Sequence, residues 1–369
     1  MIGSIFPACQ SFSGISGKEI AIQRQTWKWV AGTCAGAAVA WCAYRLWFAA
    51  GAFDWRLFLA SAGKLRWTWV AVSLVPIAGT YYGRALRWAV FLKPLKPQPS
   101  FRNLLSATVV GFTATALFGR AGEFVRPYLI AIKERVPVPS QMAAWILERL
   151  FDMLMALLFF AYALTRLAGR EANAGPALHW ILAVGGRVAG VVAVAALVLL
   201  VSMRHLAEPA RRRLLKGLRF LSEKPYRKAE HLITTFVQGV ESTRSDGALV
   251  QLLFYSMLEW VVIAACYWCL AQSCSGLIRL SLPDVIVFVG FVSFGSIVQI
   301  PGVGGGVQVV AVLVLTELFG ARLEAATFFA LVIWFITFIV VVPVGLVISL
   351  REGLSWRGLR QLSHRGESK

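Results

Sequence analysis

The sequence predicts an all-α integral membrane protein, a polytopic helical bundle with about six full spans and two broken or re-entrant segments, so eight hydrophobic segments in all. Hydrophobic residues make up 58% of the 369 residues, and the mean hydropathy is +0.68. Both values lie well above those of soluble domains. A third observation is the stretch 300–306, Ile-Pro-Gly-Val-Gly-Gly-Gly, which interrupts an otherwise apolar segment over 282–318.

Apolar windows of roughly 20 residues, the length that a spanning helix needs, predict the full spans. They are 29–50, 67–90, 143–164, 178–201, 248–271 and 325–350. Lys and Arg accumulate in cytoplasmic loops, so the basic residues orient these spans. The second span ends in Arg84, Arg87, Lys93 and Lys96, which we interpret as cytoplasmic positive charges.

This topology predicts the organisation of the chain. We expect a cytoplasmic tail over 1–26, a transmembrane domain over 27–350 that contains a basic cytoplasmic loop at 204–246, and a basic cytoplasmic tail over 351–369. Within that loop, 208–221 is a plausible surface helix. We expect no sizeable soluble domain. The location predicted is the cell (inner or plasma) membrane, with many passes and both termini in the cytoplasm.

Two segments are predicted not to cross as simple helices. The segment 101–118 holds only about 15 apolar residues and has basic residues on both sides, so it should enter and leave on the cytoplasmic face. The segment 282–318, broken at Pro301, should form a hairpin from the outer face. Opposed broken segments are typical of an inverted-repeat plan with a site near the midplane. A plain eight-span count would also place both termini on one side, so it stays open.

The break itself indicates a functional site. Pro301 removes a backbone donor, and glycines strip away helical preference at Gly302, Gly304, Gly305 and Gly306. Inside a bilayer such a break survives only where protein or a watery cavity satisfies the backbone. Gln299 and Gln308 flank it and could serve that purpose. The alternative is a surface loop between two short helices.

Charged residues follow directly after the first short segment, 101–118. Gly119 to Pro127 contains Arg120, Gly122, Glu123 and Arg126, so two arginines flank one carboxylate. Arginine can grip a phosphate through two parallel hydrogen bonds, which suits a lipid headgroup. The alternative is that these are ordinary loop charges that obey the topology rule.

A second charged group lies at the start of the span 143–164. Glu148 and Asp152 are four residues apart and share a helix face, while Arg149 and Asp152 are three apart and can pair. Each charge facing lipid would cost about 2.5–3.5 kcal/mol, so all three should point inward or lie at the membrane interface. They form either an ion pair that locks the helix orientation or a polar wall for a headgroup or proton. Glu259, inside the span 248–271, is a further candidate that needs a partner.

Enzyme signatures are missing from the sequence. It has no G-x-S-x-G elbow, P-loop, H-E-x-x-H or acidic metal cluster, and its four histidines are scattered. We therefore predict no catalytic residues, no metal and no cofactor, and transport that is passive or coupled to an ion gradient. Membrane topology and contact with lipid headgroups explain the net charge of +19. The partners predicted are lipids with polar headgroups and anionic inner-leaflet lipids at the basic loop, not nucleic acid; the oligomeric state stays open.

Taken together, the pattern over 119–126, the Glu148-Arg149…Asp152 group and the Pro-Gly run at 301–306 resemble the transmembrane region of lysylphosphatidylglycerol synthases, the flippase-like domain family. This resemblance implies a membrane fold with broken helices that moves polar lipids between leaflets. Members with synthase activity carry a separate soluble aminoacyl-transfer domain, which we expect this chain to lack. The family often shows an acid shortly after its Pro-Gly-Gly run, and the matching position here is Gln308.

The function predicted is translocation or binding of a polar lipid between leaflets, through a groove lined by re-entrant segments. The lipid could be a phospholipid, a glycolipid or a polyprenyl-linked lipid. Two alternatives stay open: a membrane-embedded transferase that modifies a lipid, and an accessory scaffold of a lipid or glycolipid pathway.

Overall fold

A computed structural model describes residues 53–167, 176–218, 220, 222–243, 245–296, 299–300 and 304–353. The predicted tail 1–26, the first span 29–50, Pro301, Gly302 and residues 354–369 lie outside the described residues. The elements are α2 (Trp55–Ala62), α3 (Trp67–Leu92), α4 (Phe101–Phe118), the 3-10 helix η1 (Gly119–Phe124), α5 (Val125–Glu134), α6 (Val138–Leu167), α7 (Pro176–Gly217), α8 (Glu223–Val240), the 3-10 turn η3 (Glu241–Thr243), α9 (Asp246–Ser273), α10 (Leu282–Gly295), β1 (Gln299–Ile300), β2 (Gly304–Gly305), α11 (Gly306–Glu317) and α12 (Leu323–Arg351).

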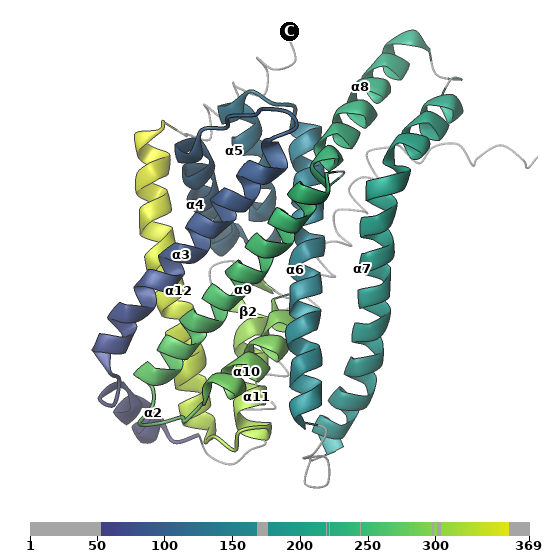
Figure 1. Cartoon of the computed structure of the whole chain (residues 1–369). Helices are drawn as coiled ribbons and strands as arrows, with labels where there is room; N and C mark the ends of the chain where they lie inside the picture. The colour runs from purple at the N-terminus through teal and green to yellow at the C-terminus, as the bar shows by residue number, and fades with distance from the viewer. Residues whose placement is uncertain are drawn as a thin grey trace, which may run out of the picture. The chain divides into compact units, whose positions relative to one another are not determined.

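Long apolar helices dominate the described part of the chain, and they confirm the all-α, multi-pass membrane prediction (Figure 1). Five stretches have the length and composition of a bilayer crossing: Phe101–Glu134, which combines α4, η1 and α5, and Val138–Leu167, Val184–Leu206, Asp246–Ser273 and Leu323–Arg351. Helix α3 has 26 residues, about 39 Å, and is also long enough to cross. Large apolar side chains such as Val191 and Val194 on α7 are exposed, as lipid-facing side chains would be.

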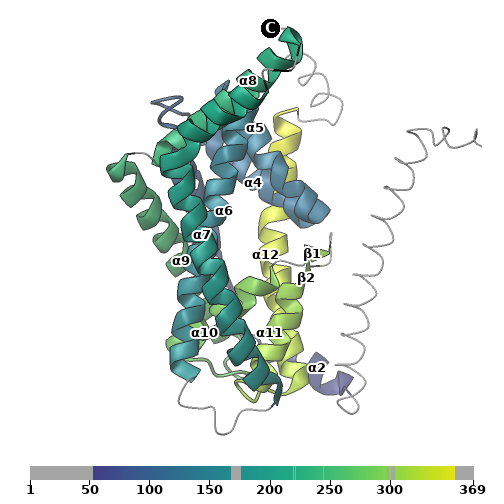
Figure 2. The same cartoon turned by 90° about the vertical axis from the view of Figure 1, so that its right-hand side faces the viewer.

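The first of these stretches is a hairpin, as predicted for 101–118. Helix α4 ends at Gly119, whose φ of 63° and ψ of −143° turn the chain back. At the open end of the hairpin, the Asn103 side-chain amide and the Ser100 backbone N–H both donate to the Glu134 carboxylate, at 2.8 and 3.1 Å. The start of α4 therefore lies beside the end of α5. The segment enters and leaves at one end of the bundle (Figure 2).

The second hairpin consists of α10 and α11, with 14 and 12 residues. These helices are about 21 and 18 Å long, shorter than the roughly 30 Å of hydrocarbon. Between them, Gln299 pairs with Gly305 and Ile300 with Gly304 in an antiparallel ladder. The Gly305 N–H donates to Gln308 Oε1 at 2.7 Å, so Gln308 does satisfy a backbone group freed by the break.

The two hairpins approach from opposite ends of the bundle, and their tips meet (Figure 2). Arg120 Nη2, in η1, donates to the Ser296 carbonyl at the end of α10, at 2.8 Å. This arrangement agrees with the two opposed re-entrant segments that the sequence predicts. The inverted-repeat plan stays a prediction.

Basic residues gather at the end of the bundle where the first hairpin opens, which we call the basic end. Lys96 contacts Glu134 at 2.7 Å and Lys133 contacts Glu352 at 2.6 Å. The connection 204–246 lies at the same end, and there one expectation was wrong. Helix α7 continues for 42 residues, through Pro209, so 208–217 belongs to the same helix as the apolar stretch before it instead of forming a separate helix. Its Ala, Arg, Leu and Lys residues are strong helix formers.

Candidate functional site

Arg87 of α3 is the centre of a buried ionic cluster. Its guanidinium contacts Glu148 Oε1 and Asp152 Oδ1 of α6, each at 2.7 Å. It also contacts Glu259 Oε2 at 3.2 Å and donates to Ser256 Oγ at 3.1 Å, both on α9. The Arg87 and Glu148 side chains are fully buried. One arginine thus joins three helices in the interior of the bundle.

Two further arginines complete the cluster. Arg126 of α5 binds both carboxylate oxygens of Glu148, with Nη1 at 3.1 Å from Oε1, which is the strong bidentate arrangement. Its guanidinium also lies over the Trp88 ring, 4.4 Å from the centroid. Arg84 Nη2 lies 2.6 Å from Glu259 Oε1. Both Glu259 carboxylate oxygens lie within ion-pair distance of an arginine, but neither has an aligned hydrogen bond among the described residues.

The cluster contains most of the charged residues that the sequence predicts, and two that it does not. Arg149 and Asp152 pair at 3.0 Å, as their spacing predicts. Glu148 does not lie at the start of its helix, because α6 begins earlier, at Val138. Arg84 and Arg87, interpreted above as cytoplasmic charges, lie in the cluster instead. The signal for them was available: two arginines three residues apart in an apolar segment need acidic partners on other helices.

A cavity of about 760 Å³ lies against this cluster, between the two hairpins and helices α6, α7 and α9. One part of its wall is charged and comprises Arg84, Arg120, Glu123, Arg126, Arg149 and Asp152. Another part is apolar and includes Met153, Phe160, Val188, Val192, Val289 and Val292. The cavity is therefore amphipathic, with charge near the hairpin tips and hydrocarbon-like surface beside α7 and α10.

The charges of the site do not cancel. The ionic cluster and the Arg120–Glu123 pair, at 2.8 Å, contain five arginines against four carboxylates, so one positive charge is in excess. The most exposed of these arginine side chains are Arg120, at 48%, and Arg149, at 36%. Both line the cavity. Its surface is accordingly suited to an anionic group.

Three buried polar atoms at the cavity have no hydrogen-bond partner among the described residues: Arg84 Nη1, Arg149 Nε and Glu123 Oε2. Buried polar atoms in folded proteins are nearly always paired. Two of the three are donors on arginines, which again suits an acceptor such as a phosphate or carboxylate oxygen. Over the described residues, no group of three or more His, Cys, Asp or Glu side chains could hold a metal ion.

Comparison with known proteins identifies the family of the chain. A family model described as the lysylphosphatidylglycerol synthase TM region matches residues 33–345. The chain belongs to this family. No curated protein matches the chain, and no solved structure does.

In this member of the lysylphosphatidylglycerol synthase TM region family, the predicted site residues lie at different places: in the ionic cluster, in the cavity wall and at the two hairpin tips. Arg126, Glu148, Arg149, Asp152 and Glu259 lie in the ionic cluster, and the Arg120–Glu123 pair lines the cavity beside it. Gly122 packs tightly against the Ala114 carbonyl and shapes the first tip. Gly304, Gly305 and Gly306 shape the second tip, where Ser296 and Val307 form the cavity wall.

Proposed function

We propose that this member of the family moves a polar lipid with an anionic headgroup between the leaflets. The headgroup would pass through the central cavity, and the acyl chains would stay against α7, α10 and the surrounding hydrocarbon. The observation that supports this most is the amphipathic cavity at the meeting point of two opposed hairpins, with one positive charge in excess. A headgroup crossing bare hydrocarbon would lose its hydration without replacement, which is costly.

The arginines replace that hydration in this proposal. Arg149 pairs with Asp152, yet its Nε has no hydrogen-bond partner among the described residues and more than a third of the side chain is exposed. Arg120 connects the two hairpin tips through the Ser296 carbonyl. A phosphate oxygen could take the place of that carbonyl, because both are acceptors. The headgroup would then part the tips as it passes between them.

Proteoliposomes that contain the full chain and a fluorescently labelled lipid test this proposal. A membrane-impermeant quencher reports how fast the label reaches the outer leaflet. We expect acceleration for phosphatidylglycerol and a clear loss in Arg149→Gln, by about tenfold for one charge-assisted hydrogen bond. Arg166→Gln is the matched control, because Arg166 is an exposed residue near the end of the same helix. Failure to accelerate any anionic, cationic or glycolipid probe would contradict the proposal.

The same vesicles separate transport from lipid modification. Mass spectrometry of the recovered lipid should show an unchanged species in transport. A new lipid species that requires Glu123 or Asp152 would instead favour the transferase alternative. Loss of pathway function on deletion of the basic connection, with lipid movement intact in vesicles, would favour a scaffold.

A further inference from the structure

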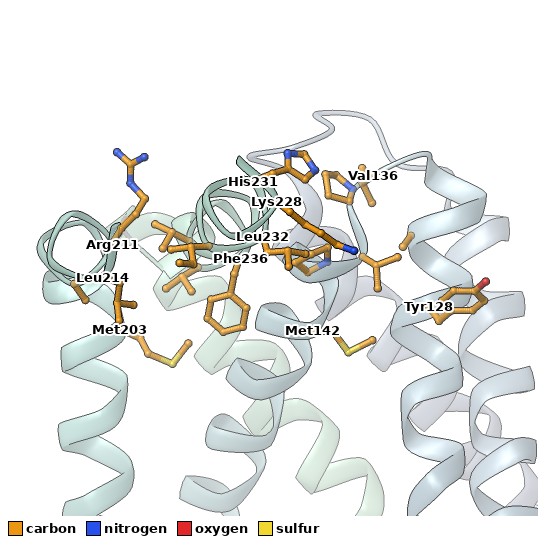
Figure 3. A pocket seen from close by; sticks show the side chains of 18 of the residues that line it. Tyr128, Val136, Met142, Met203, Arg211, Leu214, Lys228, His231, Leu232 and Phe236 are labelled. Carbon is orange, nitrogen blue, oxygen red and sulfur yellow. The ribbon is translucent and has the colours of Figure 1, made fainter. Parts of the chain in front are cut away.

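A second and larger cavity, of about 1660 Å³, lies at the basic end of the bundle. Its walls come from the α5–α6 turn, the end of α7 and helix α8, and it shares no lining residue with the central cavity. Figure 3 shows Met142, Met203 and Phe236 deep in the cavity, with Arg211 and His231 toward its rim. The proposed transport path does not use this cavity.

The cavity lies where the apolar stretch of α7 ends, the depth at which the hydrocarbon of a bilayer would give way to water. The apolar stretch of α7 ends at Leu206. The α7 residues that line the cavity lie on both sides of that point: Ser202, Met203 and Leu206 within the stretch, and Ala210, Arg211 and Leu214 beyond it. A ligand here would have one part at the depth of acyl chains and another at the depth of headgroups.

The charge of the rim is positive. Arg211 is engaged by Glu208, at 2.9 Å. Arg135 and Lys228 also line the cavity, and over the described residues they form no ion pair. Arg135 ends α5 in a left-handed conformation, φ 57° and ψ 45°. The chain turns at this residue from α5 toward the α5–α6 connection that lines the cavity. The predicted basic tail 351–369 has the same sign of charge as this rim, so it is not a complementary occupant.

The size and lining of the cavity indicate the class of ligand. Its volume exceeds the roughly 300–1,000 Å³ of ordinary small-molecule pockets, and most of the lining is aliphatic or aromatic. We infer that this cavity binds one anionic phospholipid from the leaflet at the basic end. Its acyl chains lie on Met142, Met203 and Phe236, and its phosphate lies at the rim with Arg135 and Lys228. This lipid is not the transported one.

A bound lipid there would have a structural consequence. Helix α8 already packs closely on α6, where Gly239 lies against the Ser140 carbonyl and leaves no room for a side chain. The lipid would fill the remaining space between α7, α8 and the α5–α6 turn. It would thereby brace α6, the helix that carries Glu148, Arg149 and Asp152.

Native mass spectrometry of the full chain, released from mild detergent with added phosphatidylglycerol, tests the inference. The double variant Arg135→Gln/Lys228→Gln should bind the lipid roughly 30-fold more weakly, from about fivefold for each basic residue lost. The control Arg212→Gln/Lys224→Gln removes the same charge from exposed positions on α7 and α8 outside the cavity, and should change binding little. Phosphatidylcholine should bind weakly to all forms.

Three outcomes would overturn the inference. Equal loss in both double variants would mean diffuse attraction to the basic end. Competition by soluble glycerophosphate would mean an anion site without a role for acyl chains. Loss of the same bound lipid in Arg149→Gln would place that lipid in the central cavity. A Met203→Trp variant, which fills the apolar depth while leaving the rim unchanged, should also weaken binding, and thermal unfolding checks that each variant is folded.

Discussion

The two hairpins that meet at the centre of the bundle are built differently. The first, α4–η1–α5, carries Arg120, Glu123 and Arg126 at and beside its tip, and its Arg126 pairs with Glu148 of α6. The second, α10–α11, is almost wholly apolar and satisfies its own break through backbone pairing and Gln308. One hairpin supplies charge and the other supplies a carbonyl acceptor and an apolar wall. The charged part and the apolar part of an amphipathic site can thus come from two different re-entrant hairpins.

The largest effect should come from removing the acid that anchors the first hairpin. Glu148→Ala leaves Arg87 and Arg126 buried with much less compensation. Breaking a buried ion pair in this way costs about 3–5 kcal/mol. We expect a large fall in the thermal unfolding midpoint in detergent. Glu123→Gln, which removes a carboxylate paired with a single, half-exposed arginine, is the control. An unchanged midpoint for Glu148→Ala would show that the cluster does not hold the hairpin.

Close packing is shared by both hairpins, and the next prediction tests it. A Cβ at Gly122 would overlap the Ala114 carbonyl, and one at Gly295 would overlap the backbone of Gly306. Replacing either glycine by alanine should destabilise the protein by about 1–3 kcal/mol. Gly83→Ala on α3 is the control, because nothing lies near its added Cβ. If only one hairpin responded in thermal unfolding, packing would be a difference between them and not a common feature.

The second hairpin should depend on one side-chain acceptor. Gln308→Ala leaves the Gly305 N–H without its partner, which costs about 1–2 kcal/mol. Gln308→Glu retains an acceptor oxygen and should keep most of the stability. Hydrogen exchange of the Gly305 amide measures this directly. Equal exchange in all three forms would mean that backbone pairing alone maintains the break.

The contact between the tips should matter least for stability. Arg120 is half exposed and its pair with Glu123 lies near the cavity, so Arg120→Ala should cost about 1 kcal/mol or less. The preference for anionic over zwitterionic lipid in the vesicle assay should fall nonetheless. A preference that survives in Arg120→Ala would assign the selectivity to Arg149 and the deeper arginines.

Several features could be read from the chain alone because they are local. Apolar windows of bilayer length predict helices, and the Pro-Gly run predicts a break, whatever the rest of the fold does. The short first hairpin followed from 101–118 being too short to cross. The Arg149–Asp152 pair followed from helix spacing. Each of these depends on residues within one continuous segment of the chain.

What the sequence determined is therefore a multi-pass helical membrane protein with two interrupted segments and ionic groups that must face inward. Only the tertiary structure decided which ions pair. Arg87 contacts Glu148, Asp152 and Glu259 because α3, α6 and α9 pack side by side. The same packing brings the two tips together and leaves an amphipathic cavity beside them. Hydrophobic burial selects helices without selecting their neighbours, so partners far apart in the chain are chosen only when the helices pack.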